Sequence, residues 1–579
     1  MSTCNPEKKP KLLEAEEPRT LESDVRVNGD SKLDIDSPST PPIKEYLSGV
    51  HLVALLLSLM ISVFLFALDM TILSNAIPSI TGSFHSLADV TWYSSAFSLT
   101  TAPLQSAYGK AYKYFDQKNT FLASIAIFEI GNLLSAMAQN SPMLIIGRAV
   151  SGIGGGGLIT GVFTIIAGVA PPKRVPTCMG VLGITFGVTS VVGPLLGGAL
   201  TSGPGWRWCF WINLPLGAFA AALVMSVFTT PKAAKPPVDV SMGERILHMD
   251  PAGISLVLIA ETCFVLAMQL ESERGGDFAQ AAYVGALVAS AVVLVAFVGL
   301  EWHLGERAMI QYRLLRKSLV AANVVVNFFV AGAYFPLMYI LPIYFQSVKD
   351  ASASHSGVWT IPFVLGVSIF VIISNISMPR VPWTLWLIVG PAIIIAGTVC
   401  LYTMGPDTPL VRALGFQLVT GVGIGLVLQV PIAANQGLVA GSDVPAVIGT
   451  TLFFESIGSV IFTAAVEASF VAKLVASVKG TVALAIAGVR SSDVLEAGAT
   501  GFRILFPGDV TEILNCYMDG IKSALTIVMV CACASFFFAC VALVVYFAQR
   551  RGSVSDDCSV AVCETYDADA NQKMETTSA

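Results

Sequence analysis

Long apolar runs recur along almost the whole chain, and few charged residues interrupt them. A window of about 19 residues finds fourteen runs of the length a spanning helix needs, about 20 residues. Hydrophobic residues make up 54% of the 579 residues and charged residues 12%, whereas soluble domains carry about 25% charged residues. The pattern excludes a soluble globular fold and predicts an all-α integral membrane protein with 14 transmembrane helices. The predicted spans are 50–72, 90–110, 119–138, 142–168, 178–201, 208–229, 251–270, 279–300, 319–342, 355–376, 383–403, 411–433, 444–472 and 523–548.

The basic residues of the loops predict the orientation in the membrane. Loops that alternate with the N-terminus carry most of the Lys and Arg, including Lys110, Lys113 and Lys118, whereas the opposite short loops carry few, such as Arg207 and Arg412. Short cytoplasmic loops are enriched in Lys and Arg, so both termini are expected to be cytoplasmic. We expect a multi-pass protein of the plasma membrane, with the vacuolar membrane as the alternative.

Several function classes lack their sequence signals. No basic stripe is present to neutralise phosphates, which argues against a nucleic-acid partner. The eleven cysteines show no metal-ligand spacing, so no metal site is expected. The stretch Gly152–Gly157 formally matches GxGxxG, but it lies inside an apolar run, where small residues serve helix packing. Because no phosphate-binding loop and no catalytic cluster are visible, neither an ATP-driven pump nor an enzyme is expected.

A glycine-rich stretch recurs eight spans later in the chain. Residues 147–156 align with residues 416–425 when Gly152 is placed on Gly421. Transporter folds are commonly built from repeated bundles, so we expect two six-helix bundles, spans 1–6 and 9–14, with spans 7 and 8 as an inserted helix pair. The expected parts are a disordered cytoplasmic tail (1–47), the N-terminal bundle (48–230), a linker with the inserted pair (231–318), the C-terminal bundle (319–548) with an extracytoplasmic loop (473–521), and a disordered cytoplasmic tail (549–579).

Six ionisable residues fall inside the predicted spans: Asp69, Glu129, Arg148, Glu261, Glu455 and Glu467. A charge at this depth is costly and commonly marks a pathway or a relay. Arg148 stays charged at any ordinary pH and needs a carboxylate, a carbonyl or water, unless it snorkels to the surface. Asp69 is either part of a relay or a hydrated boundary carboxylate. Glu129 is a candidate proton carrier, because a lone buried carboxyl tends to become neutral.

Other residues suggest a substrate cavity and a bending helix. Glu455 is a candidate contact for a cationic part of a substrate, and the aromatic residues Trp92, Phe97, Tyr339 and Phe454 are candidate cavity linings, with helix packing as their alternative role. For Glu261 and Glu467 a structural or snorkelling role is favoured. In span 5, Gly193, Pro194, Gly197 and Gly198 combine a kink with small-residue packing, which suits a helix that closes against a partner.

Four ordered motifs resemble the major facilitator superfamily, specifically its fourteen-span drug:proton antiporter branch, and most closely fungal toxin and multidrug efflux pumps. They are Leu68–Pro78 in span 1, Gly147–Gly154 in span 4, Gly187–Gly198 in span 5, and Trp206–Gly217, which follows span 5. The resemblance implies export by alternating access, coupled to protons through Asp69 and Arg148. It also implies a small-molecule substrate, the proton-motive force with no cofactor, and a monomer.

One motif departs from the family pattern. The loop after span 2 reads Gly109-Lys110-Ala111-Tyr112-Lys113-Tyr114-Phe115-Asp116, where the family pattern has Asp at the place of Lys113 and Gly at that of Asp116. The departure puts the conformational latch ascribed to that Asp in question. Gly109, Lys113 and Asp116 remain the candidate conformational residues, with Asp116 as the group to take over a charge contact with a neighbouring helix end.

The favoured function is therefore proton-coupled efflux of a hydrophobic or amphipathic toxin, secondary metabolite or drug. On the same fold, an importer, a siderophore transporter or a vacuolar amino-acid transporter stays open. A membrane sensor without transport activity is the alternative from another class.

Overall fold

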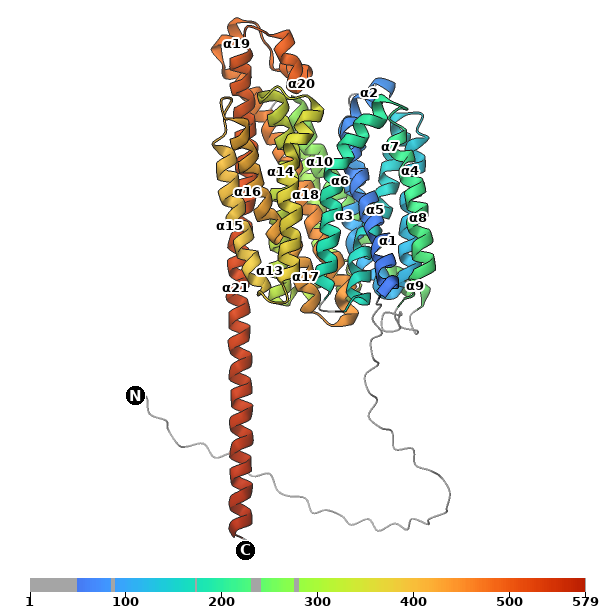
Figure 1. Cartoon of the computed structure of the whole chain (residues 1–579), viewed down its shortest axis with the longest axis vertical. Coiled ribbons are helices and arrows are strands. Elements are labelled where there is room, and N and C mark those ends of the chain that lie inside the picture. Colours follow the sequence, from blue (N-terminus) through green and yellow to red (C-terminus); the bar gives the residue numbers. More distant parts are fainter. Residues whose placement is uncertain (1–48, 85–88, 172–173, 231–240, 275–280, 578–579) are drawn as a thin grey trace, which may run out of the picture. The chain divides into compact units, whose positions relative to one another are not determined.

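A computed structural model describes residues 49–84, 89–171, 174–230, 241–274 and 281–577, which form helices joined by turns (Figure 1). The predicted tail 1–47 lies outside these residues. Thirteen helices of the described part are long and apolar enough to cross a membrane, one fewer than predicted. The difference is α3 (Val90–Tyr114), whose 25 residues suffice for a crossing but include many Thr, Ser, Gln and Lys side chains.

The helices of the first half pack around a glycine-rich helix, α5. A Cβ atom at Gly152 of α5 would overlap the Phe97 carbonyl of α3, and one at Gly154 would overlap the Phe128 backbone of α4. The glycines therefore let three helix backbones approach closely. The helices of this half are α1 (Gly49–Thr71), η1 (Ile72–Asn75), α2 (Ile77–Phe84), α3, α4 (Gln117–Ala136), α5 (Ser141–Val169), α6 (Val175–Ser202), α7 (Trp208–Trp211) and α8 (Asn213–Val227).

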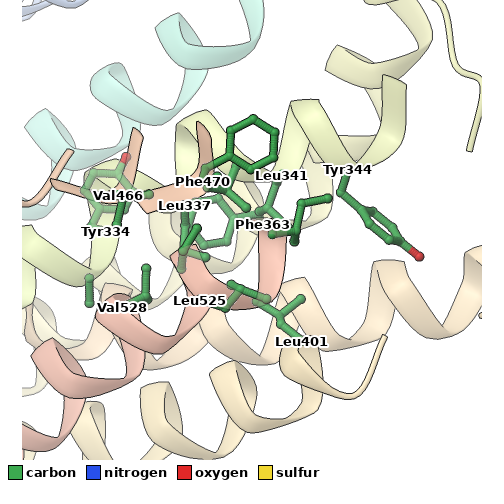
Figure 2. Packing of buried hydrophobic residues seen from close by; sticks show 14 of the residues in the cluster. Tyr334, Leu337, Leu341, Tyr344, Phe363, Leu401, Val466, Phe470, Leu525 and Val528 are labelled. Carbon is green, nitrogen blue, oxygen red and sulfur yellow. The ribbon is translucent and has the colours of Figure 1, made fainter. Parts of the chain in front are cut away.

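The second half has its own apolar core. Figure 2 shows part of it, in which Leu337 of α13, Phe363 of α14 and Leu525 of α21 pack together. The helices of this half are α13 (Ser318–Ile343), η4 (Tyr344–Val348), α14 (Ala353–Ser377), α15 (Trp383–Tyr402), α16 (Leu410–Val427), α17 (Val430–Gly437), η5 (Gly441–Asp443), α18 (Val444–Gly480), α19 (Val482–Ile486), α20 (Ser491–Leu505) and α21 (Val510–Thr577).

The two halves repeat the same helix contacts. In the first half, Gly152 of α5 faces the Phe97 carbonyl of α3. In the second half, Gly421 of α16 faces the Phe363 carbonyl of α14 in the same way. Gly423 likewise faces the backbone of Ile394 on α15, as Gly154 faces α4. The glycine-rich stretches aligned in the sequence thus occupy equivalent places in the two halves.

An additional helix pair lies between the halves in the chain. It consists of α10 (Pro251–Arg274) and α11 (Ala281–Leu304), preceded by α9 (Met242–Leu247) and followed by η3 (Gly305–Arg307) and α12 (Tyr312–Leu315). Helix α10 contacts α11, α18 and α3. The pair therefore contacts a helix of each half.

Two predicted irregular segments differ in the structure. Helix α18 continues to Gly480 and α21 begins at Val510, so helices, with α19 and α20 between them, occupy most of the predicted loop 473–521. Helix α21 also continues through the predicted disordered tail, 549–579, as far as Thr577. After Gly552 this segment contains no Gly or Pro to end the helix.

Candidate transport site

A buried ion pair joins α1 to α5. Arg148 donates from Nη1 to Oδ2 of Asp69 over 2.5 Å and from Nη2 to the Asp69 carbonyl over 3.3 Å. The side chains are 1% and 0% exposed, respectively. Taking both charges out of water is costly, and good geometry with further hydrogen bonds has to compensate. The structure therefore brings the two predicted coupling residues into direct contact, and their role in proton coupling stays a prediction.

Aromatic rings and a backbone carbonyl complete the surroundings of Arg148. Its Nε donates to the Tyr93 carbonyl over 3.0 Å, and its guanidinium lies 4.7 Å from the ring centroid of Phe97 and 6.0 Å from that of Phe210. Cations are attracted to aromatic faces at such distances. The cation thus keeps partners of its own if the carboxylate of Asp69 becomes neutral.

Helix α6 packs closely against the end of α1 beside this pair. A Cβ atom at Gly193 would overlap the Thr71 hydroxyl, and one at Gly197 would overlap the Ile72 carbonyl. Thr71 is the last residue of α1, two residues after Asp69. Pro194 lies inside α6, and Gly198 is half-buried. The predicted conformational glycines therefore support the backbone that carries Asp69.

The second half has a neutral counterpart of Arg148. Gln417 lies four residues before Gly421, just as Arg148 lies four residues before Gly152. Its Nε2 donates to the Trp359 carbonyl, which is equivalent to the contact between Arg148 and Tyr93. The same place in the fold thus holds a guanidinium in one half and an amide in the other.

Glu129 lies apart from the ion pair, on the side of α4 that faces α8. A Cβ atom at Gly217 of α8 would overlap its carboxyl group, and neither carboxyl oxygen has a hydrogen-bond partner among the described residues. Asp69 is within electrostatic range. One turn along the same interface, Asn213 donates to Oδ1 of Asn132 over 3.1 Å. Glu129 is therefore a buried carboxyl at a polar seam, and its predicted role as a proton carrier stays a prediction.

A cavity of about 100 Å³ lies between the two halves, with room for several water molecules. Phe66, Phe97 and Phe186 line it from the first half, and Tyr334, Phe335 and Glu455 from the second. Of the remaining nineteen lining residues, nine are aliphatic (Val, Leu, Ile or Met) and seven are Ser, Thr or Gln. The cavity thus combines aromatic and aliphatic side chains with several uncharged polar groups and one carboxyl group, a mixture that ligand sites commonly have.

Two of the five predicted substrate residues line the cavity, and three do not. Glu455 lines the cavity, where Asn327 of α13 donates to its Oε2 over 2.9 Å. Phe97 also lines it, so this ring lies between the cavity and Arg148. The other three lie elsewhere: Phe454 packs against the additional helix pair, Tyr339 interacts with Glu467, and Trp92 lies in the first turn of α3. Consecutive helix residues point about 100° apart, so Glu455 and Phe454 face different surfaces.

Lys113, Arg313 and Asp443 form a charged cluster, here named the latch, at one end of the bundle. Lys113 of α3 donates to Oδ1 of Asp443 over 2.8 Å, and Arg313 of α12 donates to both carboxylate oxygens over 2.9 and 3.1 Å. The hydrogen bonds to Asp443 raise the pKa of Arg313 further above its usual value, and a guanidinium is charged at any ordinary pH. In the family pattern an acidic residue at position 113 makes a contact between helices. In this chain the contact is made by the cation of Lys113, and the acidic partner is Asp443.

The other two latch candidates have separate roles. Asp116 accepts a hydrogen bond from the Asn119 amide over 3.0 Å and so caps α4, while Lys113 makes the contact between helices. A Cβ atom at Gly109 would lie 2.7 Å from the Pro445 carbonyl and 3.0 Å from the Cα atom of Gly449. Gly109 and Gly449 therefore let α3 and α18 cross closely beside the latch.

Several residues of the site were not among the predicted ones. Asn327, Gln105 and Gln429 face the cavity or Glu455, and each was visible only as a polar residue in an apolar run. Asp443 and Arg313 lie between predicted spans, where a charged residue is ordinary and gives no functional signal. No sequence signal pairs Asp443 with Lys113, because 330 residues separate them.

Comparisons with known proteins agree with this architecture. The model of the Major Facilitator Superfamily matches residues 59–463. The "MFS-type transporter grgE" of a Penicillium species is 38% identical over 493 residues, which cover 85% of this chain and 86% of the relative. The "Dehydrocurvularin exporter" of Aspergillus terreus is 33% identical over 493 residues, covering 84% and 85%.

A solved structure shows the same fold at low sequence identity. The human organic anion transporter MFSD10 superimposes with a TM-score of 0.56 at 12% identity, covering 85% of this chain and all of that one. The likeness concerns the arrangement of helices, and that arrangement places the cavity between two helix bundles.

Proposed function

Because the chain belongs to the major facilitator superfamily of membrane transporters, we propose that it is a proton-coupled exporter of apolar or amphipathic small molecules. It is a multi-pass membrane protein. The proposed direction of transport is supported by fungal relatives whose names describe efflux pumps and exporters. The proposed mechanism is alternating access, in which two bundles rock around a central site.

The observation that carries proton coupling is the place of the ion pair beside the cavity. Met70, the neighbour of Asp69, and Phe97, which stacks against Arg148, both line the cavity. Protonation of Asp69 would break its ion pair with Arg148 and leave the guanidinium to the Tyr93 carbonyl and the aromatic rings. Arg148 therefore connects a change of charge at Asp69 to Phe97, a residue of the cavity wall.

The driving force suffices for such a step. Each proton that moves inward gains about 2.3 kcal/mol per 100 mV of membrane potential. The proposal needs no cofactor, since the proton-motive force supplies the energy. Glu129, in electrostatic range of Asp69, is the proposed secondary proton carrier.

The cavity favours neutral or cationic amphipathic molecules. Glu455 is the charged residue among its described lining residues, and a carboxylate repels anions. The aromatic and aliphatic walls favour flat apolar molecules, since burying apolar surface contributes about 25 cal/mol per Å². Glu455 is therefore the proposed contact for a cationic or hydrogen-donating substrate group.

The proposed topology has fourteen spans. They are the thirteen helices that are apolar enough to be identified by composition, together with the more polar helix α3. Both termini and the latch then face the cytoplasm, by the basic loops. The close approaches of α3 to α18 and of α6 to α14 lie in the latch-side parts of these helices, at Gly109, Gly180 and Gly187 among others. We take this as an outward-facing conformation of a plasma-membrane protein that works as a monomer.

Export from inside-out vesicles tests the proposed function. Vesicles that contain the protein accumulate a fluorescent amphipathic cation when an inward-acidic gradient is imposed, and an uncoupler abolishes the accumulation. Asp69→Asn is expected to lose the gradient-dependent part, while Asp407→Asn, an exposed loop residue, keeps it. Accumulation that persists with the uncoupler, or in the Asp69→Asn protein, would contradict proton coupling through this residue.

A further inference from the structure

A segment between the additional helix pair and the second half is bound tightly to both halves. This connector comprises residues 305–313, which follow α11 and include η3 and the start of α12. We propose that the connector is a strap that holds the latch end closed, and that Lys110 of α3 is the residue that positions it. The proposal rests on alternating access as described above, and it gives the additional helices a task in transport.

Lys110 is an unusual residue, because its long cationic side chain is 1% exposed. Its Nζ donates to the carbonyls of Glu306, Arg307 and Ala308. These carbonyls belong to η3 and to Ala308, the residue after it, and hydrogen bonds from a charged donor are stronger than those between neutral groups. Ser106, one turn earlier on α3, donates to the Met309 carbonyl over 2.8 Å. Four consecutive connector carbonyls are therefore held by α3 of the first half.

Two carboxyl groups of the additional pair hold the same stretch from the other side. Glu301 accepts hydrogen bonds from the amides of Met309 and Ile310 over 3.1 and 2.7 Å. Asp250, just before α10, accepts from the Met309 amide over 3.0 Å. The carboxyl groups of Asp250 and Glu301 also act electrostatically on Lys110. The connector backbone is thus fixed between Lys110 and two carboxyl groups.

The connector then reaches the second half through the latch. Arg313 bonds both carboxylate oxygens of Asp443, directly before α18. The additional pair also packs against α18 through an apolar cluster that includes Val257, Phe297, Met309 and Phe453. The strap therefore contacts the second half through this apolar cluster and the ion pair of Arg313 with Asp443. Its contacts with the first half are the hydrogen bonds of Lys110 and Ser106, beside His248, which stacks on the ring of Tyr114 at 4.7 Å.

This difference indicates which contacts open. When the latch end opens, water enters the seam between α3 and α18. Water can replace the hydrogen bonds of Lys110 and Ser106, whereas separating the apolar cluster would expose hydrophobic surface. The pair accordingly moves with the second half, and the contacts of Lys110 and Ser106 are those that break and re-form in each cycle.

A reporter in the other seam detects opening without touching the strap. Asn375 of α14 is fully buried, and a Cβ atom at Gly180 of α6 would lie 3.6 Å from its Cβ atom. In the purified full-length protein, Asn375→Cys is labelled with a water-soluble maleimide, and labelling of the protein without this cysteine is subtracted. Lys110→Met is expected to speed labelling by about tenfold or more, because hydrogen bonds to a charged group are lost. Lys110→Arg is expected to restore most of the slow rate.

The chain offers a matched control. Lys118 of α4 donates to the Met225 carbonyl of α8 over 2.7 Å, a similar bond that stays within the first half. Lys118→Met is therefore expected to leave labelling unchanged. Equal labelling of the wild-type and Lys110→Met proteins, or equal acceleration by Lys118→Met, overturns the proposal. Labelling measures opening alone, so this result stands apart from whether protons drive transport.

A tether tests the same idea without removing the lysine. A short thiol crosslinker between Ser106→Cys and Met309→Cys is expected to abolish transport of the fluorescent cation, and cleavage of the crosslinker to restore it. The control joins Ser469→Cys to Ser523→Cys, whose hydroxyl groups lie 2.8 Å apart within the second half. Full transport by the crosslinked Ser106–Met309 protein would show that these contacts need not break, and so would overturn the proposal even if Lys110→Met does not fold.

Discussion

Removing the carboxylate of Asp69 leaves the guanidinium of Arg148 buried without its counter-ion. Both side chains are at most 1% exposed, so solvent cannot replace the lost partner. Breaking a buried pair from one side costs about 3–5 kcal/mol. We therefore expect Asp69→Asn to destabilise the protein by roughly that amount, and Arg148→Gln alone to cost less because an isolated Asp69 becomes neutral by protonation.

The fold itself indicates which second substitution compensates. At the position equivalent to Arg148, Gln417 donates to the Trp359 carbonyl, so a glutamine at position 148 can donate to the Tyr93 carbonyl in the same way. The Asp69→Asn/Arg148→Gln protein contains no uncompensated charge. It should recover most of the lost stability, with a coupling energy of about 3 kcal/mol between the two sites.

Thermal unfolding of the four purified proteins in detergent measures the coupling energy, and vesicle export measures function. We expect the double variant to be nearly as stable as the wild type and yet to show no export that an uncoupler abolishes. Additive destabilisation would show that the two residues do not form this pair. Uncoupler-sensitive export by the double variant would refute the assignment of proton coupling to the pair.

Three further predictions concern the latch, the second seam and the cavity. Asp443→Asn weakens the contacts with Lys113 and Arg313. Because these cations are partly exposed, we expect the equilibrium to shift by about 1–2 kcal/mol toward an open latch end, which faster maleimide labelling of a seam cysteine would measure. Unchanged labelling would contradict a role of Asp443 in closing this end. Gly187→Val places a methyl-bearing carbon where the Ser368 hydroxyl lies, so export should fall and Ser368→Gly should restore part of it, whereas full export by Gly187→Val alone would show that the seam is loose. Glu455→Gln removes the carboxylate of the cavity lining. In vesicle uptake we expect the KM for a cationic substrate to rise and the KM for a neutral substrate to change little. Equal changes in the two KM values would argue against a charge contact.

The sequence predicts the helices and the rare charges well, for physical reasons. A helix in a bilayer needs a long apolar run, so the runs locate nearly all of the spans. Asp69 and Arg148 were identifiable separately because a charge at bilayer depth is rare. Their pairing cannot be predicted in this way, since it depends on how closely α5 approaches α1, where a Cβ atom at Gly155 would lie 3.1 Å from the ring of Phe66.

The faces of the helices could not be predicted in the same way. A membrane helix is apolar on all sides, so hydrophobic periodicity gives no direction for its inner face. For this reason the sequence predicts a substrate contact for Phe454 as well as for Glu455, although the two residues face different surfaces. The partner of Glu455, Asn327, was hidden for the same reason. Charged contacts between distant loops, such as that between Lys113 and Asp443, are likewise absent from any local pattern.

The repeated halves bear on how the proposed proton coupling could act on one bundle alone. The equivalent positions of Arg148 and Gln417 share the same backbone contact, so the contact itself serves the fold. The charge was placed in one half alone, beside Asp69 and against the ring of Phe97. A proton that neutralises Asp69 therefore changes the first half and leaves its counterpart unaltered. Such a change affects one of two otherwise similar bundles. Protonation can then favour one direction of rocking, as a proton-coupled transporter requires.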